Sequence, residues 1–269
     1  MSQPSSVAPR VLLAVGLGAL VLGYWRRGAL PEVGRLAAGL ASEPLQGPTD
    51  RRPFTINYEG VAYEVAPVAA YDLTGIVVTH NDITAIGDDD HDETSLDTKD
   101  LCVVWGQNVA SGHFRHADFW SNDWSCHWQY SGEQRIDSAS ISNNHLITDS
   151  DAIRSQIGSV RVGDQVRFQG LLVNYKHPSW TRMRRTSITR TDVGGTACEV
   201  VFVESIELLR KSPRLWYALV PIGWTLLALA LALAAWAMVR RPAFARAESI
   251  DGDPERRPSD PRLGRLRRG

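Results

Sequence analysis

The sequence predicts a mainly β domain held between two apolar membrane segments. Three observations lead to this prediction: an uncharged apolar run at residues 215–239, a shorter one at residues 11–25, and a series of short β-patterned segments between them. The mean hydropathy of −0.19 excludes a polytopic transporter. The formal net charge of −1 gives no global basic field, so we expect no nucleic acid partner.

The run at residues 215–239 carries no charged side chain. As a helix it is long enough to cross the roughly 30 Å hydrocarbon layer of a bilayer. Trp216, Tyr217 and Trp236 lie near its ends, where aromatic residues meet the membrane surface. We therefore predict a transmembrane helix at residues 215–239.

The run at residues 11–25 is shorter and lies between Arg10 and Arg26. Its length suits an uncleaved membrane anchor and also the apolar part of a signal sequence. Residues 1–27 are accordingly predicted to be an N-terminal anchor or a signal sequence.

The C-terminal residues 240–269 are rich in proline and charge, and they are expected to form a disordered basic tail. Positively charged flanks remain in the cytoplasm, which puts this tail inside and the main domain outside. The flank of the first segment points the other way, with Arg26, Arg27 and Arg35. The tail has the larger excess, nine arginines at positions 240, 241, 246, 256, 257, 262, 265, 267 and 268.

Arginine greatly outnumbers lysine, a bias typical of GC-rich bacterial genomes. The expected location is therefore the bacterial inner membrane, with the domain on the extracytoplasmic side. Residues 28–53 contain Pro44, Gly47, Pro48 and Pro53, which disfavour a long regular element and indicate a linker. The folded domain is expected at residues 54–210.

Five segments of the domain have the β-branched, aromatic or alternating pattern of strands. They are residues 71–80, 101–106, 124–130, 165–175 and 198–208. A helix is predicted at residues 149–157, with Ser150 or Asp151 as its cap and Ile153 and Ile157 on one face. Three strands, a helix and two strands is the order of a five-stranded OB-like small barrel with one helix. A small β-barrel of another topology also fits.

Four stretches together resemble a family of uncharacterised bacterial proteins that have a soluble OB-like domain near membrane segments. The resemblance covers roughly residues 70–210 and implies a fold and a location, but no activity and no catalytic residue. The stretches are DLCVVWGQN (100–108), SNNHLI (142–147), VRVGDQVRFQGLLVNY (160–175) and RTSITRTDVGGTACEVVFV (185–203).

Cys102, Cys126 and Cys198 each fall in or beside a predicted strand. Outside the cytoplasm two of them can pair. The third and fifth strands of such a barrel can be neighbours, which favours Cys126–Cys198. A Cys102–Cys126 bond across a hairpin and three buried thiols are the alternatives.

The segment 176–190 is the strongest candidate for a binding surface. It lies between the fourth and fifth predicted strands, where OB-folds carry a ligand loop. Arginines beside an exposed aromatic ring can hold phosphates, carboxylates or sugars. Besides membrane lipid, the expected partners are a protein, an anionic head group or an acidic polysaccharide. The candidate residues are Lys176, Trp180, Arg182, Arg184, Arg185 and Arg190.

Two other clusters suggest metal binding. The acidic run at residues 88–93 offers oxygen donors, and His113 and His116 precede Cys126 and His127. A solvated loop and ordinary surface histidines are the favoured explanations of these two clusters. No nucleophile elbow, phosphate loop or dinucleotide fingerprint is present. The sequence therefore favours a binding or assembly module without cofactor over an enzyme, with a metal-binding protein or metal-dependent enzyme as the alternative.

Overall fold

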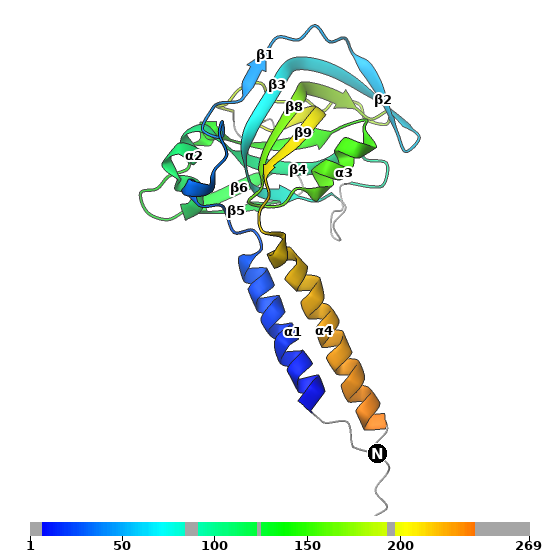
Figure 1. Ribbon diagram of the computed structural model, residues 1–269. Coiled ribbons are helices and arrows are strands. Elements are labelled where there is room, and N and C mark those ends of the chain that lie inside the picture. Colours follow the sequence, from blue (N-terminus) through cyan, green and yellow to red (C-terminus); the bar gives the residue numbers. More distant parts are fainter. Residues whose placement is uncertain (1–6, 84–90, 123–124, 193–196, 240–269) are drawn as a thin grey trace, which may run out of the picture.

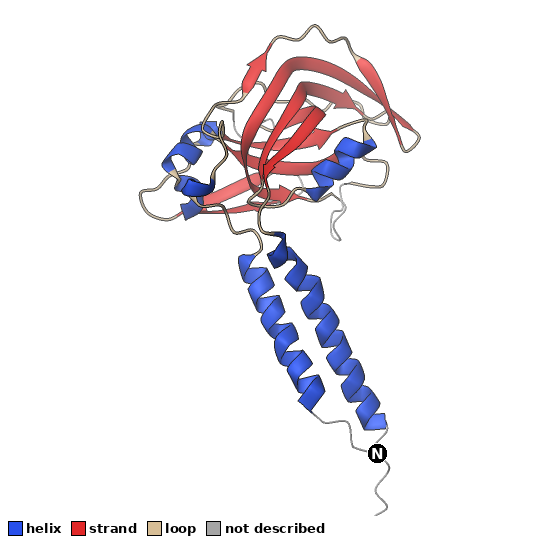
Figure 2. Cartoon of the chain, in the orientation of Figure 1, coloured by secondary structure: helices blue, strands red, loops and turns tan. Residues whose placement is uncertain are grey.

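The computed structural model describes residues 7–83, 91–122, 125–192 and 197–239. It is a mainly β domain from which two long helices leave side by side in the same direction (Figures 1 and 2). The tail at 240–269 and residues 88–90 of the acidic run lie outside the described residues. The predicted β class is confirmed.

The strands form one seven-stranded mixed sheet and one two-stranded sheet. The strands of the larger sheet are β1 (Leu45–Gly47), β2 (Phe54–Tyr58), β3 (Val61–Asn81), β4 (Asp97–Val104), β7 (Ile141–Ile147), β8 (Gln165–Lys176) and β9 (Glu199–Arg210). The smaller sheet pairs β5 (Ala117–Ser121) with β6 (Cys126–Tyr130). The short helices are α2 (Gly106–Ser111), α3 (Asp151–Ser159), η1 (Val33–Arg35), η2 (His113–His116) and η3 (Ser138–Ser140).

Five strands of the larger sheet are joined by a closed sequence of pairings. Starting from β3, antiparallel pairing leads to β4 and then to β7, parallel pairing leads to β9, and antiparallel pairing leads to β8 and back to β3. The strand β3 is 21 residues long, which lets it pair with β1 and β2 as well as with its ring neighbours β4 and β8. We call these five strands the strand ring.

The third strand of the ring is not the one that the sequence predicted. Residues 126–130 form β6, which pairs only with β5, and β7 takes the expected place beside β4. The large and polar side chains of β6 alternate, which is typical of a half-exposed strand. In β7 every residue is buried, although Asn143, Asn144 and His145 are polar. Because of these polar residues, the hydrophobic pattern of the sequence does not identify β7 as a core strand.

A single apolar core joins all five ring strands to α3. The helix begins as predicted, because Ser150 Oγ accepts a hydrogen bond from the Ile153 amide. Ile157 at its inner face is fully buried. The larger members of this core are Tyr71, Leu73, Leu101, Val103, Trp105, Leu146, Val166, Phe168, Leu172, Val201 and Val203.

Residues 28–53 are packed on the domain, whereas the sequence indicated a linker. The strand β1 pairs with β3, and Leu40 is buried. The side chain of Gln165 accepts a hydrogen bond from the Ala37 amide and donates one to the Arg35 carbonyl. The prolines exclude a long helix here, but irregular backbone still packs because the domain supplies its hydrogen-bond partners.

The helices α1 (Val7–Arg26) and α4 (Arg214–Val239) are each long and apolar enough to cross a membrane. The first is longer than the predicted apolar run. The two helices touch through glycines: a Cβ atom added at Gly16 would lie 3.1 Å from the Gly223 carbonyl oxygen, and one at Gly223 would lie 2.7 Å from Leu20. Small residues permit such close approach of helices in a membrane.

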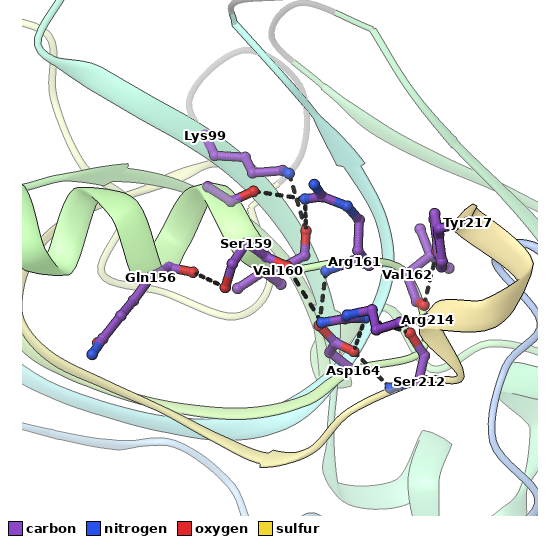
Figure 3. Close-up of polar contacts among 11 residues, drawn as sticks. Lys99, Gln156, Ser159, Val160, Arg161, Val162, Asp164, Ser212, Arg214 and Tyr217 are labelled. Carbon is purple, nitrogen blue, oxygen red and sulfur yellow. Dashed lines mark hydrogen bonds and ion pairs between the residues drawn. The ribbon is translucent and has the colours of Figure 1, made fainter. Parts of the chain in front are cut away.

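An ion pair with a buried carboxylate joins α4 to the strand ring (Figure 3). Arg214 donates hydrogen bonds to both carboxylate oxygens of Asp164, at 2.8 and 2.7 Å. The amides of Ser212 and Arg161 also donate to this carboxylate, each at 2.8 Å. Tyr217 adds a hydrogen bond to the Val162 carbonyl. The start of α4 is thus held against the turn that precedes β8.

Candidate functional site

The six predicted loop residues separate into two groups. Trp180, Arg182 and Arg185 are exposed, and Lys176 is half-buried. The Trp180 ring packs on the rings of Tyr175 and His177, at centroid distances of 5.5 and 5.8 Å. By contrast, Arg184 and Arg190 are partly buried against the domain. Only the first group forms an accessible surface.

Arg190 closes one end of the apolar core. Its guanidinium lies 3.2 Å from a carboxylate oxygen of Glu199 and packs over the rings of Tyr71 and Trp105, at 5.7 and 5.4 Å. Glu199 is buried at the start of β9. Arg190 therefore stabilises the domain, which removes it from the predicted binding surface.

Burial raises the pKa of Glu199 from 4.5 to about 8, although Arg190 acts in the opposite direction. The folded protein therefore binds this proton more tightly than the unfolded chain. The stabilisation is complete below pH 4.5 and is lost as the pH rises to about 8. We expect Glu199→Gln to flatten the dependence of the thermal unfolding midpoint on pH between 5 and 8. An unchanged slope would contradict this assignment.

A second polar cluster lies on β4 and β7 and was not predicted from the sequence. Asp97, Asp100 and His145 each present a ligand atom, and these atoms all lie within 4.8 Å of one another. All three residues are buried. Asp100 and His145 are direct cross-strand partners, with Oδ1 of the first 2.7 Å from Nδ1 of the second.

The cluster concentrates negative charge in a buried position. Burial, together with the nearby Arg184, lowers the pKa of His145 to about 3, so its imidazole is neutral at physiological pH. The Tyr175 hydroxyl donates to Oδ2 of Asp97 at 2.6 Å. The other oxygen, Oδ1, is buried and has no hydrogen-bond partner among the residues described.

Two carboxylates and a neutral imidazole are a suitable ligand set for a divalent transition-metal ion. Buried carboxylates need a cation or well-placed donors to offset their desolvation. Arg184 supplies part of this compensation, since its charge acts on His145 and on Tyr175, the hydroxyl of which donates to Asp97. A bound metal ion would supply the rest.

The histidines predicted as ligands are not gathered into such a group. His113 Nδ1 lies 3.0 Å from the Arg135 carbonyl oxygen, and His116 is exposed. His127 stacks on Trp120. Within the described ranges, the Asp97–Asp100–His145 group is the one cluster of three metal-ligating side chains.

The disulfide bond joins Cys102 and Cys126, so the prediction of Cys126–Cys198 is wrong. That prediction depended on placing Cys126 in the third strand of the barrel, which was a mistake. Because Cys126 lies on β6 rather than in the ring, it packs with Cys102 in an apolar cluster on β4. Cys198 is half-buried before β9 and accepts a hydrogen bond from Asn143.

Removal of this disulfide by Cys126→Ser should destabilise the protein by about 2–4 kcal/mol, because the bond restricts the unfolded chain. Thermal unfolding of the full chain in detergent measures the loss. Cys198→Ser serves as the control and should cost clearly less. Equal losses in the two variants would contradict the expected role of the bond.

Comparison of the chain with protein-family models, curated proteins and solved structures finds no match. The function must therefore be inferred from the geometry of the sites themselves.

Proposed function

We propose that the protein is a membrane-anchored binding module that presents the exposed part of the 176–190 loop away from the membrane. The position of this loop carries the proposal. The strands β8 and β9 have one end beside α4, where Asp164 and Arg214 pair, and the loop joins their opposite ends. A ligand bound there would lie across the domain from the two apolar helices.

We infer that the strand ring is an OB-type barrel. The OB-fold closes five strands and carries a helix between its third and fourth strands. In chain order, β3, β4, β7, β8 and β9 are the first to fifth strands of the ring, and α3 lies between β7 and β8. The pairing of the first strand with the fourth, seen between β3 and β8, supports this assignment.

We also propose that the domain lies on the extracytoplasmic side of a bacterial inner membrane. The disulfide Cys102–Cys126 supports this side, because such bonds persist in oxidising compartments. The nine arginines after residue 239 support a cytoplasmic tail. A reporter fused after Gly269 should then be active only in the cytoplasm, and activity outside would overturn this orientation.

The ligand of the loop is expected to be anionic. Arg182 and Arg185 are exposed and form no ion pair within the described residues, and Trp180 beside them offers a ring face. Guanidinium groups bind carboxylates and phosphates in a planar, two-pronged geometry. An acidic protein segment or polysaccharide has this chemistry, and the extracytoplasmic side makes nucleic acid an unsuitable partner.

A photo-crosslinking residue at Trp180 tests this surface in intact cells. We expect a captured partner whose yield falls when Arg182→Glu and Arg185→Glu are introduced, because the charges then repel an anion. The matched control is Arg52→Glu, an exposed arginine elsewhere on the domain. Equal yields in both variants, or no capture in the wild type, would contradict binding at this loop.

A second candidate function is divalent metal binding at Asp97, Asp100 and His145. The favouring observation is the buried, unbonded Oδ1 of Asp97 beside two further ligand atoms. Titration of the metal-depleted full chain with cobalt(II) should give one equivalent of bound metal with d–d absorption bands. Asp97→Asn should abolish the bands, whereas His113→Ala should retain them. Failure of the wild type to bind cobalt would exclude this function.

A further inference from the structure

A cavity of about 670 Å³ lies at the base of the domain, next to the ends of the two long helices. It is lined by the last turn of α1, the first turn of α4, the η1 segment and the start of β8. Because α1 ends and α4 begins here, the cavity falls at the level of lipid head groups if the helices span the membrane.

Five cationic side chains from separate segments of the chain converge on this cavity. Arg26 comes from α1, Arg35 from η1, Arg115 from η2, and Arg210 and Lys211 from the end of β9. All five are exposed. Glu32 is the one acidic residue of the lining.

These cations have no charged partner of their own within the described part of the chain. None of the ion pairs of that part includes any of the five residues. Arg214, which lies nearby, differs because Asp164 neutralises it. The cavity therefore has a surplus of positive charge that an anion would balance.

Two tryptophans mark the same level. Arg26 lies over both rings, 5.6 Å from that of Trp25 and 5.2 Å from that of Trp216. Trp25 is 74% exposed. Tryptophan is enriched at the boundary between hydrocarbon and head groups, and the helices below offer an apolar surface to acyl chains.

We propose that this cavity binds the head group of an anionic phospholipid, with its phosphate held by Arg115, Arg210 and Lys211. The proposal rests on the proposed function, since it requires that α1 and α4 span a membrane. Phosphate is the shared chemistry of a lipid and of the free ion. A net anionic lipid is favoured over a zwitterionic one because the lining has five cations and a single carboxylate. This surplus of positive charge would repel a choline group.

Native mass spectrometry of the full chain in detergent tests the proposal, with phosphatidylglycerol, phosphatidylcholine or inorganic phosphate added. We expect the wild type to hold phosphatidylglycerol on the order of tenfold more tightly than phosphatidylcholine, because several cations near a head group favour an anionic lipid. Arg115→Gln with Arg210→Gln should remove this preference. Arg52→Gln with Arg135→Gln, two exposed arginines outside the cavity, should retain it.

The single variant Lys211→Gln, which should weaken the preference in part, provides a second measurement if the double variant is unstable. No preference in the wild type, an unchanged preference in the cavity variants, or displacement of the lipid by millimolar phosphate would each overturn the proposal. Carbonate extraction of cell membranes distinguishes a failure of the lipid site from a failure of the membrane anchor. A chain that stays in the membrane without lipid preference contradicts only the lipid site, and a chain released by carbonate contradicts the anchor.

Discussion

Replacement of Arg214 by leucine is expected to lower the free energy of unfolding of the domain by roughly 2–4 kcal/mol. Asp164 has a fully buried side chain, and the substitution removes its charged partner. The amides of Ser212 and Arg161 still donate to the carboxylate, and the Arg214 side chain is 36% exposed. Both facts keep the loss below that of an entirely buried pair. Thermal unfolding of the full chain in detergent measures it.

An exposed pair on the same domain provides the control. Arg167 donates to Asp72 through two nitrogen atoms, but the two side chains are 44% and 17% exposed. Water screens such a pair, so Arg167→Leu should cost no more than about 1 kcal/mol. A double-mutant cycle of Asp164→Ala and Arg214→Leu should give a clear coupling energy. Additive effects of the two substitutions would contradict the role of the pair.

The same pair bears on the conflict between the flanking charges of the two apolar helices. On the domain side, Arg214 is neutralised by Asp164, and Arg26 lies over two tryptophan rings. In the folded protein, Arg214 therefore pairs within the domain, and Arg26 lies in the proposed lipid site. The tail lies beyond the described residues, and the proposed orientation rests on the number of its arginines.

The elements predicted correctly are those whose signal is local. The apolar runs become α1 and α4, and the capped helix becomes α3. The predicted strands at 71–80, 101–106, 165–175 and 198–208 fall in β3, β4, β8 and β9. The strand β7 was missed because its burial depends on neighbours far along the chain. Asn144 on this strand donates to the Leu101 carbonyl, 43 residues away. Such a partner leaves no trace in a short window of sequence.

The candidate sites show the same limit. Asp164 lies in the turn before β8, but the partner of its carboxylate is 50 residues further on. Asp97, Asp100 and His145 meet only because β4 and β7 pair in one register. Charged residues inside otherwise buried strands were the available signal. The surface part of the 176–190 loop was predicted from the sequence. The inward positions of Arg184 and Arg190 could be recognised only from the folded structure.

The largest loss of stability is expected for Gly170→Ala, at roughly 3 kcal/mol or more. Gly170 lies on β8 between Tyr71 of β3 and Val203 of β9, next to a register shift. A Cβ atom here would clash with the backbone carbonyl oxygen of Phe202. Backbone cannot rotate away as a flexible side chain can, so the β8–β9 pairing must shift. Loss of detergent-extracted, disulfide-bonded protein or a lower unfolding midpoint would show this destabilisation.

Gly158→Ala in α3 is the matched control, with an effect of opposite sign. A Cβ atom at Gly158 would meet no heavy atom within 4 Å. Alanine is more favourable than glycine by up to about 1 kcal/mol in a helix interior and by less in the last turn, where Gly158 lies, so this variant should be slightly more stable than the wild type. If both alanine variants were equally stable, β8 and β9 could not approach each other as closely as the five-strand pairing requires. The closure of the ring, and with it the OB-type assignment, would then be wrong.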